Sequence, residues 1–481
     1  MKSRWFILIL ILLTTSLQGQ VIRGLYVNRF DDILGNRSLE DDLCRYVEES
    51  RINHLLFYSL HRLDFSDPGQ MNQLRSFISR LRTDYGVDYI GAVHESYEYF
   101  EYEIHPYNMD PATDVSARFN VLNLEFEYWS QSAIDNYYCE RYLRPVGFPC
   151  TEDGAFMYVE KSLKAMQMFK KELPELSTEV YIGWIEPWHA VKLSGIVDRV
   201  LPAIYRSANQ QGEINLYQYD QQRERLRNLA LGGEVRIVPI FNGSLNDIGP
   251  NLYAWLQDGH TVCEPWDHYL TAFIAESDTL IRNRITPEGY VWFKYFSMPP
   301  VPYNLESPNP LTGPALAFTG DTVEYVATAV DGADRYRWYF QCHNQWFETG
   351  AGQTTIKIVL EKECYESVSV QAFACGEKSN ASVIYTDIRR RISSDIGERV
   401  EAPRILISHD GYRLKLHTNL QPGTSSRLMI LDLYGRLLLD QEVNSFGPGE
   451  HSVSLRLQTG VYLAICSGPG FNHSQKFVVG L

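Results

Sequence analysis

Runs typical of β-strands alternate with amphipathic, helix-like stretches through residues 21–299 of this chain. The strand-like runs are Gly24–Phe30, His54–Leu60, Tyr89–Glu95, Phe119–Trp129, Glu179–Ile185, Val200–Arg206, Val235–Asn242 and Tyr290–Ser297. The helix-like stretches include Leu39–Ile52, Met71–Tyr85, Gly154–Leu176, Leu216–Ala230 and Leu252–Glu276. Eight strands that alternate with helices are typical of a parallel (β/α)8 barrel. We therefore predict an α/β TIM-type barrel over residues 21–299, with functional groups at the carboxyl ends of its strands.

The fourth predicted strand, Phe119–Trp129, carries polar side chains on one face. Its apolar and polar residues alternate, so Asn123, Glu125 and Glu127 point to the same side. Carboxylates on the interior side of a strand cost free energy, because each charge must be desolvated or paired. We interpret this face as part of a site. The alternative is a solvated edge strand whose polar face meets water.

The same strand resembles the fourth-strand signature of the chitinase and endo-β-N-acetylglucosaminidase family, glycoside hydrolase family 18. That signature reads Asp-x-x-Asp-x-Asp-x-Glu, and its four positions hold Asn120, Asn123, Glu125 and Glu127 here. The terminal glutamate, which is the family's general acid, is kept as Glu127. All three aspartates are changed, two to asparagine and one to glutamate.

The resemblance implies acid-assisted, substrate-assisted hydrolysis of glycans that contain N-acetylglucosamine. Glu127 would protonate the glycosidic oxygen, and Glu125 would orient the substrate acetamide, whose oxygen attacks the anomeric carbon. Tyr205 matches the sixth-strand tyrosine that binds the acetamide carbonyl, and Arg206 replaces the aspartate beside it. The predicted catalytic residues are therefore Glu127, Glu125 and Tyr205.

Other strand ends supply candidates for substrate binding. Trp129 and Trp184 lie at strand exits, where an indole ring can stack on a sugar, and Trp292 could replace the family's eighth-strand tryptophan. The predicted substrate-binding residues are Asn123, Trp129, Trp184, Arg206, Asn242 and Trp292. Further polar residues at strand ends are Ser59, His61, His94, Glu95 and Glu186. For Tyr205 and Trp292, ordinary packing in the barrel core is the alternative.

Two other functions stay open on the sequence. The changed aspartate positions, Arg206 and the missing tryptophan favour a catalytically inactive barrel that binds glycan or protein at the cell surface. A hydrolase of a different glycan would pair Glu127 with Glu186 or with Glu264.

The chain begins like an exported protein. Two basic residues precede an apolar run, Trp5–Leu13, and small polar residues follow, so residues 1–20 are typical of a secretory signal peptide. The run is too short to span a bilayer, and we expect no transmembrane segment in the mature protein. The net charge of -15 argues against a nucleic-acid partner.

An exported protein can hold its cysteines oxidised. Cys139 and Cys150 flank a loop just after the carboxylate strand and are the best disulfide candidates, and two of Cys342, Cys364 and Cys375 are expected to pair. No Cys-x-x-Cys or His-x-x-x-His spacing occurs in the sequence, so we expect neither a metal site nor a cofactor.

Two small all-β domains are predicted after the barrel. Residues 300–314 are rich in proline and read as a linker to an immunoglobulin- or PKD-like β-sandwich at 315–390. We expect this middle domain to be a spacer or an accessory sugar-binding module. A charged linker over residues 391–403 then leads to a last domain at 404–481.

The last domain carries three sequence pieces and a closing strand in a characteristic order. They begin at Leu428, Gly449 and Thr459, and the chain closes with Lys476-Phe-Val-Val. Together they resemble the type A sorting domain of the type IX secretion system of Bacteroidetes. The resemblance implies a β-sandwich that contacts the secretion machinery, so that the protein is secreted or held at the outer-membrane surface.

Overall fold

The computed structural model describes residues 21–205, 217–244, 252–390, 405–409, 413–418, 424–432, 436–446, 449–455, 457, 460–468 and 471–479. The predicted signal peptide, Arg206 and the predicted linker at 391–403 lie outside the described residues. The chain divides into two compact units, Met1–Arg390 and Arg391–Leu481.

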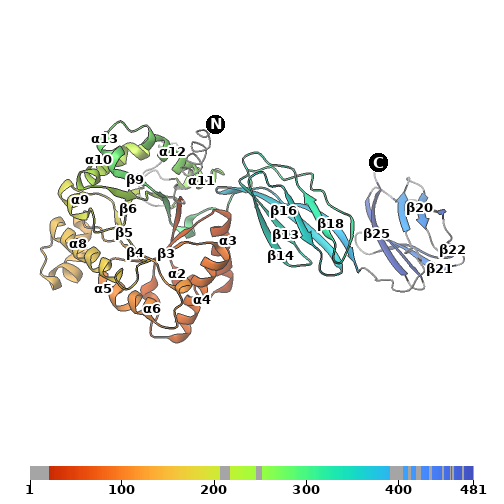
Figure 1. The fold of residues 1–481 in the computed structure, drawn as a ribbon, viewed down its shortest axis with the longest axis horizontal. Helices are drawn as coiled ribbons and strands as arrows, with labels where there is room; N and C mark the ends of the chain where they lie inside the picture. Colours follow the sequence, from red (N-terminus) through yellow and green to blue (C-terminus); the bar gives the residue numbers. More distant parts are fainter. Residues whose placement is uncertain are drawn as a thin grey trace, which may run out of the picture. The chain divides into compact units, whose positions relative to one another are not determined.

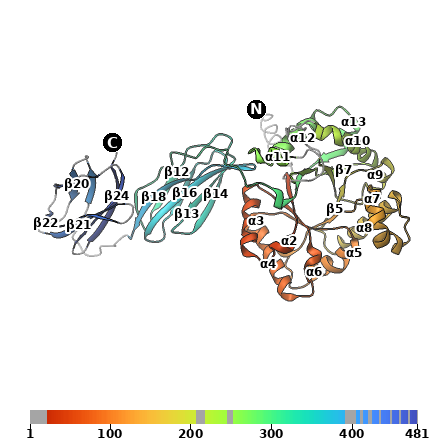
Figure 2. The ribbon, with the colours of Figure 1, turned by 180° about the vertical axis from the view of Figure 1, so that it is seen from behind.

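The first unit contains a closed ring of parallel strands with helices around it (Figures 1 and 2). The ring strands are β1 (Ile22–Val27), β2 (His54–Phe57), β3 (Tyr89–His94), β4 (Val121–Leu124), β5 (Ser177–Ile182), β6 (Arg199–Ile204), β8 (Ile240–Asn242) and β10 (Gly289–Phe293). Two short strands, β7 (Val235–Ile237) and β9 (Ile285–Pro287), extend the sheet from β6. Because β1 pairs with both β2 and β10, and β5 with β6, the ring closes. The predicted (β/α)8 barrel is confirmed.

The longer helices cover the outside of the ring (Figure 1). They are α3 (Arg37–Glu49), α4 (Pro68–Tyr85), α8 (Glu152–Phe169), α10 (Tyr217–Gly232) and α12 (Glu264–Ile274). The shorter helices are α2 (Phe30–Ile33), α5 (Tyr97–Tyr99), α6 (His105–Met109), α7 (Gln131–Ala133), α9 (Pro187–Leu193), α11 (Tyr253–Gln257) and α13 (Thr279–Arg284). Short 3-10 and π turns are η1 (Leu60–Arg62), η2 (Phe100–Ile104), η3 (Val115–Ala117), η4 (Ile134–Leu143), η5 (Arg144–Val146) and η6 (Tyr295–Ser297).

Helix α4 shows how local sequence sets these elements. The Asp67 side chain accepts a hydrogen bond from the Gly69 N–H and so caps the start, and Pro68 occupies the first turn, where its missing N–H costs nothing. Gly86 ends the helix with φ 65°, a left-handed conformation that glycine adopts without a steric penalty.

The side chains of each ring strand alternate between two cores. On β4, Val121 packs in the barrel interior with residues such as Tyr26 and Val93, whereas Leu122 and Leu124 pack outward against the helices. This alternation turns Asn123 and then Glu125 toward the interior, as the sequence pattern predicts.

A buried polar cluster occupies the barrel interior on the amino-terminal side of Glu125. The Arg199 Nε donates to Glu179 Oε1 at 2.7 Å, and Asn123 Nδ2 donates to Glu179 Oε2 at 3.1 Å. The His54 Nε2 lies 3.5 Å from the same carboxylate, and burial lowers the pKa of His54 to about 4, which keeps it neutral. Asn123 is therefore fully buried and hydrogen-bonded to Glu179 inside the barrel.

The middle domain consists of two β-sheets. Its strands are β11 (Leu316–Phe318), β12 (Thr322–Val326), β13 (Arg335–Phe340), β14 (Gln345–Gly350), β15 (Thr355–Val359), β16 (Cys364–Ala374), β17 (Glu377–Lys378) and β18 (Ser382–Arg389). The main sheet has the order β11-β18-β16-β13-β14, and β12 pairs with β15. Tyr325 and Ile356 of the small sheet share a core with Trp338 and Val370 of the main sheet. The predicted all-β class is confirmed for this part of the chain.

Three disulfides occur among the described residues. Cys139–Cys150 is the predicted pair, and Cys342–Cys364 joins two of the three later cysteines. The third, Cys375, pairs with Cys263 of the barrel, a bridge that the sequence analysis did not foresee. Among the described residues, His343 and Glu366 lie beside the Cys342–Cys364 pair, but the two sulfurs are bonded to each other.

The second unit is also all-β. Its strands are β19 (Ile405–His409), β20 (Arg413–Thr418), β21 (Thr424–Asp432), β22 (Leu437–Phe446), β23 (Gly449–Ser454), β24 (Gly460–Gly468) and β25 (Phe471–Val479). They form two antiparallel sheets with the orders β19-β20-β23 and β22-β21-β24-β25. In the part of the chain that the structure describes, no helix is long and apolar enough to cross a membrane.

Candidate active site

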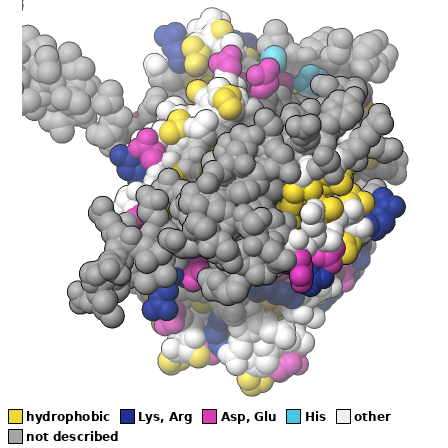
Figure 3. All heavy atoms as spheres, turned by 90° about the vertical axis from the view of Figure 1, so that its right-hand side faces the viewer, with side chains coloured by type: hydrophobic (Ala, Val, Ile, Leu, Met, Phe, Trp, Pro, Cys, Tyr) yellow, Lys and Arg dark blue, Asp and Glu magenta, His cyan; other side chains and the backbone are white. Residues whose placement is uncertain are grey.

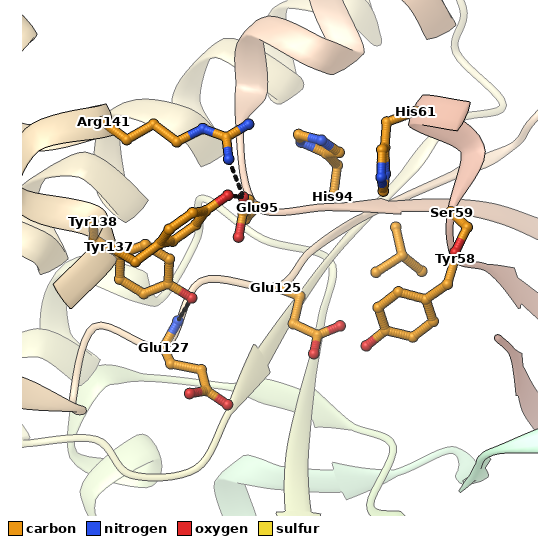
Figure 4. Close-up of a pocket in the computed structure, with 11 residues that line it drawn as sticks. Tyr58, Ser59, His61, His94, Glu95, Glu125, Glu127, Tyr137, Tyr138 and Arg141 are labelled. Carbon is orange, nitrogen blue, oxygen red and sulfur yellow. Dashed lines mark hydrogen bonds and ion pairs between the residues drawn. The ribbon is translucent and has the colours of Figure 1, made fainter. Parts of the chain in front are cut away.

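A pocket of about 410 Å³ opens at the carboxyl ends of β2, β3 and β4 (Figure 4). It contains both carboxylates of the fourth strand and polar groups from the two strands beside it. The lining residues are Tyr58, Ser59, His61, Val93, His94, Glu95, Glu125, Glu127, Tyr137, Tyr138 and Arg141. The polar strand ends of β2 and β3 therefore meet Glu125 and Glu127 in one cavity, at the end of the barrel where such sites form.

The backbone after β4 holds the two glutamates in place. The Glu125 N–H donates to the His94 carbonyl at 3.0 Å, which extends the β3–β4 pairing by one residue. Between and after the glutamates, Phe126 and Tyr128 are fully buried on the opposite side. The Tyr128 hydroxyl donates to the Trp184 carbonyl at 2.7 Å. Buried aromatic anchors thus fix the direction in which both carboxyl groups point.

Glu125 is held as a neutral carboxylic acid. Burial first, and then the nearby charge of Glu127, raise the pKa of Glu125 to about 8. The Oε2 atom of Glu125 is buried and has no hydrogen-bond partner among the described residues. Burial also raises the pKa of Glu127. Two carboxyl groups with unequal affinity for one proton are the arrangement that acid–base catalysis requires.

Tyrosines surround the Glu125 carboxyl. Burial first, and then charges that include Glu125, raise the pKa of Tyr26 and of Tyr205 well above the ordinary value. The Tyr205 ring stacks on Phe293 with centroids 5.8 Å apart and lies 6.3 Å from Tyr181. Tyr205, a predicted catalytic residue, therefore lies within electrostatic reach of Glu125, although it is not among the residues that line the pocket.

The segment η4 forms one wall of the pocket over the end of β3 (Figure 4). The Tyr137 and Tyr142 hydroxyls donate to Glu95 Oε1 at 2.7 and 2.5 Å, and Arg141 Nη1 lies 3.8 Å from the same atom. The Tyr138 ring stacks on Phe126 at 4.0 Å. These η4 residues were not predicted from the sequence. The sequence feature that could have indicated them is the run Tyr-Tyr-Cys-Glu-Arg-Tyr, which contains the first cysteine of the predicted disulfide.

His94 presents a neutral imidazole to the pocket. Its Nδ1 accepts a hydrogen bond from the Ser96 N–H at 3.0 Å, so the proton of the neutral ring is on Nε2. Burial lowers the pKa of His94 to about 4, and the ring stacks on Tyr99 at 4.2 Å. A fixed tautomer of this kind can donate one hydrogen bond to a sugar hydroxyl.

Most of the predicted substrate-binding residues lie outside this pocket. Asn123 binds Glu179 in the interior, and the Trp184 Nε1 donates to Glu186 at 2.8 Å. Trp129 packs edge-on against Tyr181 at 5.2 Å. Asn242 is buried at the end of β8, and its Nδ2 has no partner among the described residues. Arg206 lies outside the described residues.

Trp292 does not replace the family's tryptophan at the site, and the alternative, packing in the core, is what the structure shows. Val291 and Phe293 point into the barrel interior, so the strand alternation turns Trp292 outward into the core beneath the helices. There its Nε1 donates to the Val262 carbonyl at 2.9 Å, and the side chain is fully buried. Trp292 therefore does not contact the pocket.

The carboxylates of the alternative catalytic pairs also lie elsewhere. Glu186 accepts the Trp184 indole N–H, and Glu264 accepts the Thr261 N–H at 2.9 Å at the start of α12. Neither of them lines the pocket that contains Glu127. The geometry favours Glu125 as the carboxyl partner of Glu127.

No family model matches this chain, and no curated protein matches it. Among solved structures, a β-glucuronidase of Bacteroides uniformis, β-glucuronidase 3, is similar at 10% identity and TM-score 0.32, covering 95% of this chain and 62% of that one. A Parabacteroides merdae β-glucuronidase is similar at 10% identity and TM-score 0.32 over 95% and 61%. Another B. uniformis β-glucuronidase gives 7% identity and TM-score 0.36 over 95% and 64%.

The chain therefore spans less than two thirds of the length of these enzymes. At 7–10% identity and TM-scores of 0.32–0.36, this similarity indicates nothing about the residues of the site.

Proposed function

We propose that this protein is an exported glycosidase that hydrolyses glycans containing N-acetylglucosamine. The observation that carries the proposal is the carboxyl pair after β4, in which Glu125 keeps its proton near neutral pH beside Glu127 in an open pocket. The resemblance of this strand to the family 18 signature supports the substrate class.

In the proposed reaction the substrate supplies its own nucleophile. The acetamido oxygen bonds to the anomeric carbon as the glycosidic C–O bond breaks, and the proton that Glu125 holds in the resting pair passes through Glu127 to the leaving oxygen. Glu125, ionised by that transfer, orients the acetamide by accepting its N–H, and the Tyr205 hydroxyl donates to the acetamide carbonyl. Water then opens the oxazolinium ring and returns a proton to Glu127.

The pocket walls suit a neutral sugar. Tyr137 presents an aromatic ring that is 41% exposed, and a pyranose can stack its apolar face on such a ring. The neutral Nε2–H of His94 and the Ser59 hydroxyl supply polar contacts. The Arg141 charge is shared with Glu95, so the wall carries little free positive charge.

Binding without hydrolysis is the second candidate function. Asn123 is engaged by Glu179 and by the Tyr26 hydroxyl at 3.4 Å, so it does not support Glu125. A Glu125–Glu127 pair that has no hydrogen bond from Asn123 could bind a glycan without cleaving it.

Hydrolysis by the full chain tests the proposal. Fluorogenic chito-oligosaccharides and released N-glycans are offered to the wild type, Glu127→Gln, Glu125→Gln and the exposed surface control Glu101→Gln. We expect the first two variants to lose about 10²–10⁴-fold in kcat with binding retained, and the control to be unchanged. Binding of these glycans by every form, with release by none, would establish the binding barrel instead.

Export by the type IX secretion system is part of this proposal. It is supported by the sequence pieces at residues 428–479 and by the two-sheet architecture of the second unit. In a Bacteroidetes host, removal of residues 404–481 is expected to leave the protein in the periplasm. Unchanged appearance at the surface or in the medium would contradict this part of the proposal.

A further inference from the structure

The main sheet of the middle domain carries two exposed aromatic pairs on its outward side. Tyr339 of β13 stacks on Trp346 of β14 with ring centroids 4.2 Å apart. Tyr365 of β16 stacks on Tyr385 of β18 at 5.6 Å, with the rings within 13° of parallel. Trp346, Tyr365 and Tyr385 are 61%, 66% and 52% exposed. Large aromatic side chains on a free sheet surface indicate a binding function.

The strand register places both pairs on one face. Tyr339 is opposite Ser369 on β16, and Tyr385 is opposite Ser367 on the same strand. Ser367 and Ser369 are two residues apart, so they point to the same side, and cross-strand partners share that side. We call this surface, which comprises Tyr339, Trp346, Tyr365 and Tyr385, the aromatic face.

The core of the domain does not use the aromatic face. The opposite side of the main sheet carries Trp338, Phe340 and Val368, which pack against the small sheet formed by β12 and β15. Burial alternates along β16, with Glu366, Val368 and Val370 inside. The four rings are therefore not needed to complete the sandwich core.

The charges around the rings favour a neutral occupant. Arg389 pairs with Asp387 at 2.7 Å on β18, and Arg337 lies 3.8 Å from Glu348. Between the aromatic pairs the sheet presents the hydroxyl groups of Ser367 and Ser369. On the side of the molecule that Figure 3 displays, basic and acidic side chains of the described residues lie close to one another. Paired charges give no attraction for a polyanion or for a charged peptide.

We propose that the aromatic face binds a neutral oligosaccharide or polysaccharide chain. Flat rings flanked by hydroxyl groups match a pyranose, which has an apolar C–H face and polar edges. One pair lies on β16 and β18 and the other on the neighbouring strands β13 and β14, so their centres are two strand spacings apart across the sheet, about 10 Å, and one chain must cover more than one sugar ring to contact both. This site is separate from the barrel pocket and does not depend on the proposed hydrolysis.

Affinity electrophoresis of the full chain tests this site. The Glu127→Gln protein is run in native gels that each contain one soluble neutral polysaccharide: mixed-linkage β-glucan, galactomannan, xyloglucan or glycol chitin. The variants on this background are Trp346→Ala, the pair Tyr365→Ala/Tyr385→Ala, and Trp346→Phe, which keeps an aromatic ring. Trp188→Ala is the matched control, since Trp188 is 57% exposed on the barrel.

We expect retardation by at least one polysaccharide, about tenfold weaker binding in both alanine variants, and near-parental binding in Trp346→Phe and Trp188→Ala. Unchanged thermal unfolding would show that the exposed rings serve binding and not stability. Retardation by none of the gels, or equal retardation of all variants, overturns the proposal. Self-association of the parent that Trp346→Ala abolishes, without any effect of polysaccharide, would assign the face to a second copy of the chain instead.

Discussion

At the scale of single residues, Glu125 lies where burial and a neighbouring carboxylate both favour its protonated form. Its pKa is about 8 in the folded protein, against an ordinary value of 4.5. Between these two pH values the unfolded chain releases the proton while the folded protein keeps it. The free energy of unfolding therefore falls as the pH rises through this window.

Glu125→Gln should remove this pH dependence. One pKa unit corresponds to about 1.4 kcal/mol, and the open pocket screens part of the shift, so we expect the variant to be about 1–3 kcal/mol more stable than the wild type at pH 8. The two proteins should be equally stable near pH 4. Urea unfolding at pH 4, 6 and 8 measures this, with Glu101→Gln as the control. A difference that is constant with pH would contradict the assigned protonation state.

The buried pair of Glu179 and Arg199 supports a second prediction at this scale. Glu179→Gln removes the nearer counter-ion of the buried Arg199 guanidinium, because Glu179 is 2.7 Å away and fully enclosed, whereas the remaining partner Glu288 is 4.0 Å away. We expect a loss of about 3–5 kcal/mol in the free energy of unfolding. The double variant Glu179→Leu/Arg199→Met should recover much of that loss.

A surface ion pair supplies the control for that measurement. Arg45 and Asp42 pair on α3 with both side chains about half exposed, so Asp42→Asn should cost less than about 1 kcal/mol. If Glu179→Gln cost no more than Asp42→Asn, the interior cluster would not depend on the charge pair.

The same residues show what the sequence could predict. A period of two puts Asn123, Glu125 and Glu127 on one side of their strand whatever the rest of the chain does. The partner that engages Asn123 could not be predicted, because Glu179 is 56 positions away in the sequence. The parallel pairing of β4 with β5, in which Asn123 is opposite Glu179, brings these two side chains together.

At the scale of elements, the strand–helix alternation was enough to predict the barrel, since each ring strand lies within a predicted run or overlaps it. The wall segment η4 was missed, because a short π-type stretch has no amphipathic period to detect. The side of β10 to which the Trp292 side chain points was also not predicted. One position of register decides whether a strand side chain faces the interior or the helices.

The Cys139–Cys150 disulfide closes η4 over the pocket with a sequence separation of 11 residues. Its removal in Cys139→Ser/Cys150→Ser is expected to cost about 2–3 kcal/mol. Tyr137 and Arg141 would then hold Glu95 less firmly. We therefore expect KM, or Kd for a bound glycan, to rise several-fold with little change in kcat.

The disulfide of the middle domain is the matched control. Cys342→Ser/Cys364→Ser removes a bridge with a separation of 22 residues that is not part of the pocket. It should lower the thermal stability of the chain without changing KM. If both pairs of substitutions changed KM equally, the role of η4 in substrate binding would be contradicted.

At the scale of the whole molecule, the barrel and the middle domain are joined by a bridge between Cys263 and Cys375, 112 residues apart. Ion pairs also join the two domains. Lys378 Nζ is 2.7 Å from Glu49, and Arg337 is 2.6 Å from Glu48 at the end of α3. We expect the disulfide to contribute most to the coupling, because closing so long a loop lowers the conformational entropy of the unfolded chain by the equivalent of about 4–5 kcal/mol. These ion pairs are mostly buried, so the cost of desolvating their charges offsets much of their attraction.

Cys263→Ser/Cys375→Ser should therefore uncouple the two domains. In calorimetry of the full chain, we expect the barrel and the middle domain of the wild type to unfold in one transition and those of the variant to unfold in two, because each domain has its own hydrophobic core. The Cys342→Ser/Cys364→Ser control keeps the inter-domain bridge, so its barrel and middle domain should still unfold together. A single transition in the Cys263→Ser/Cys375→Ser protein, only shifted to lower temperature, would mean that the ion pairs suffice to couple the domains.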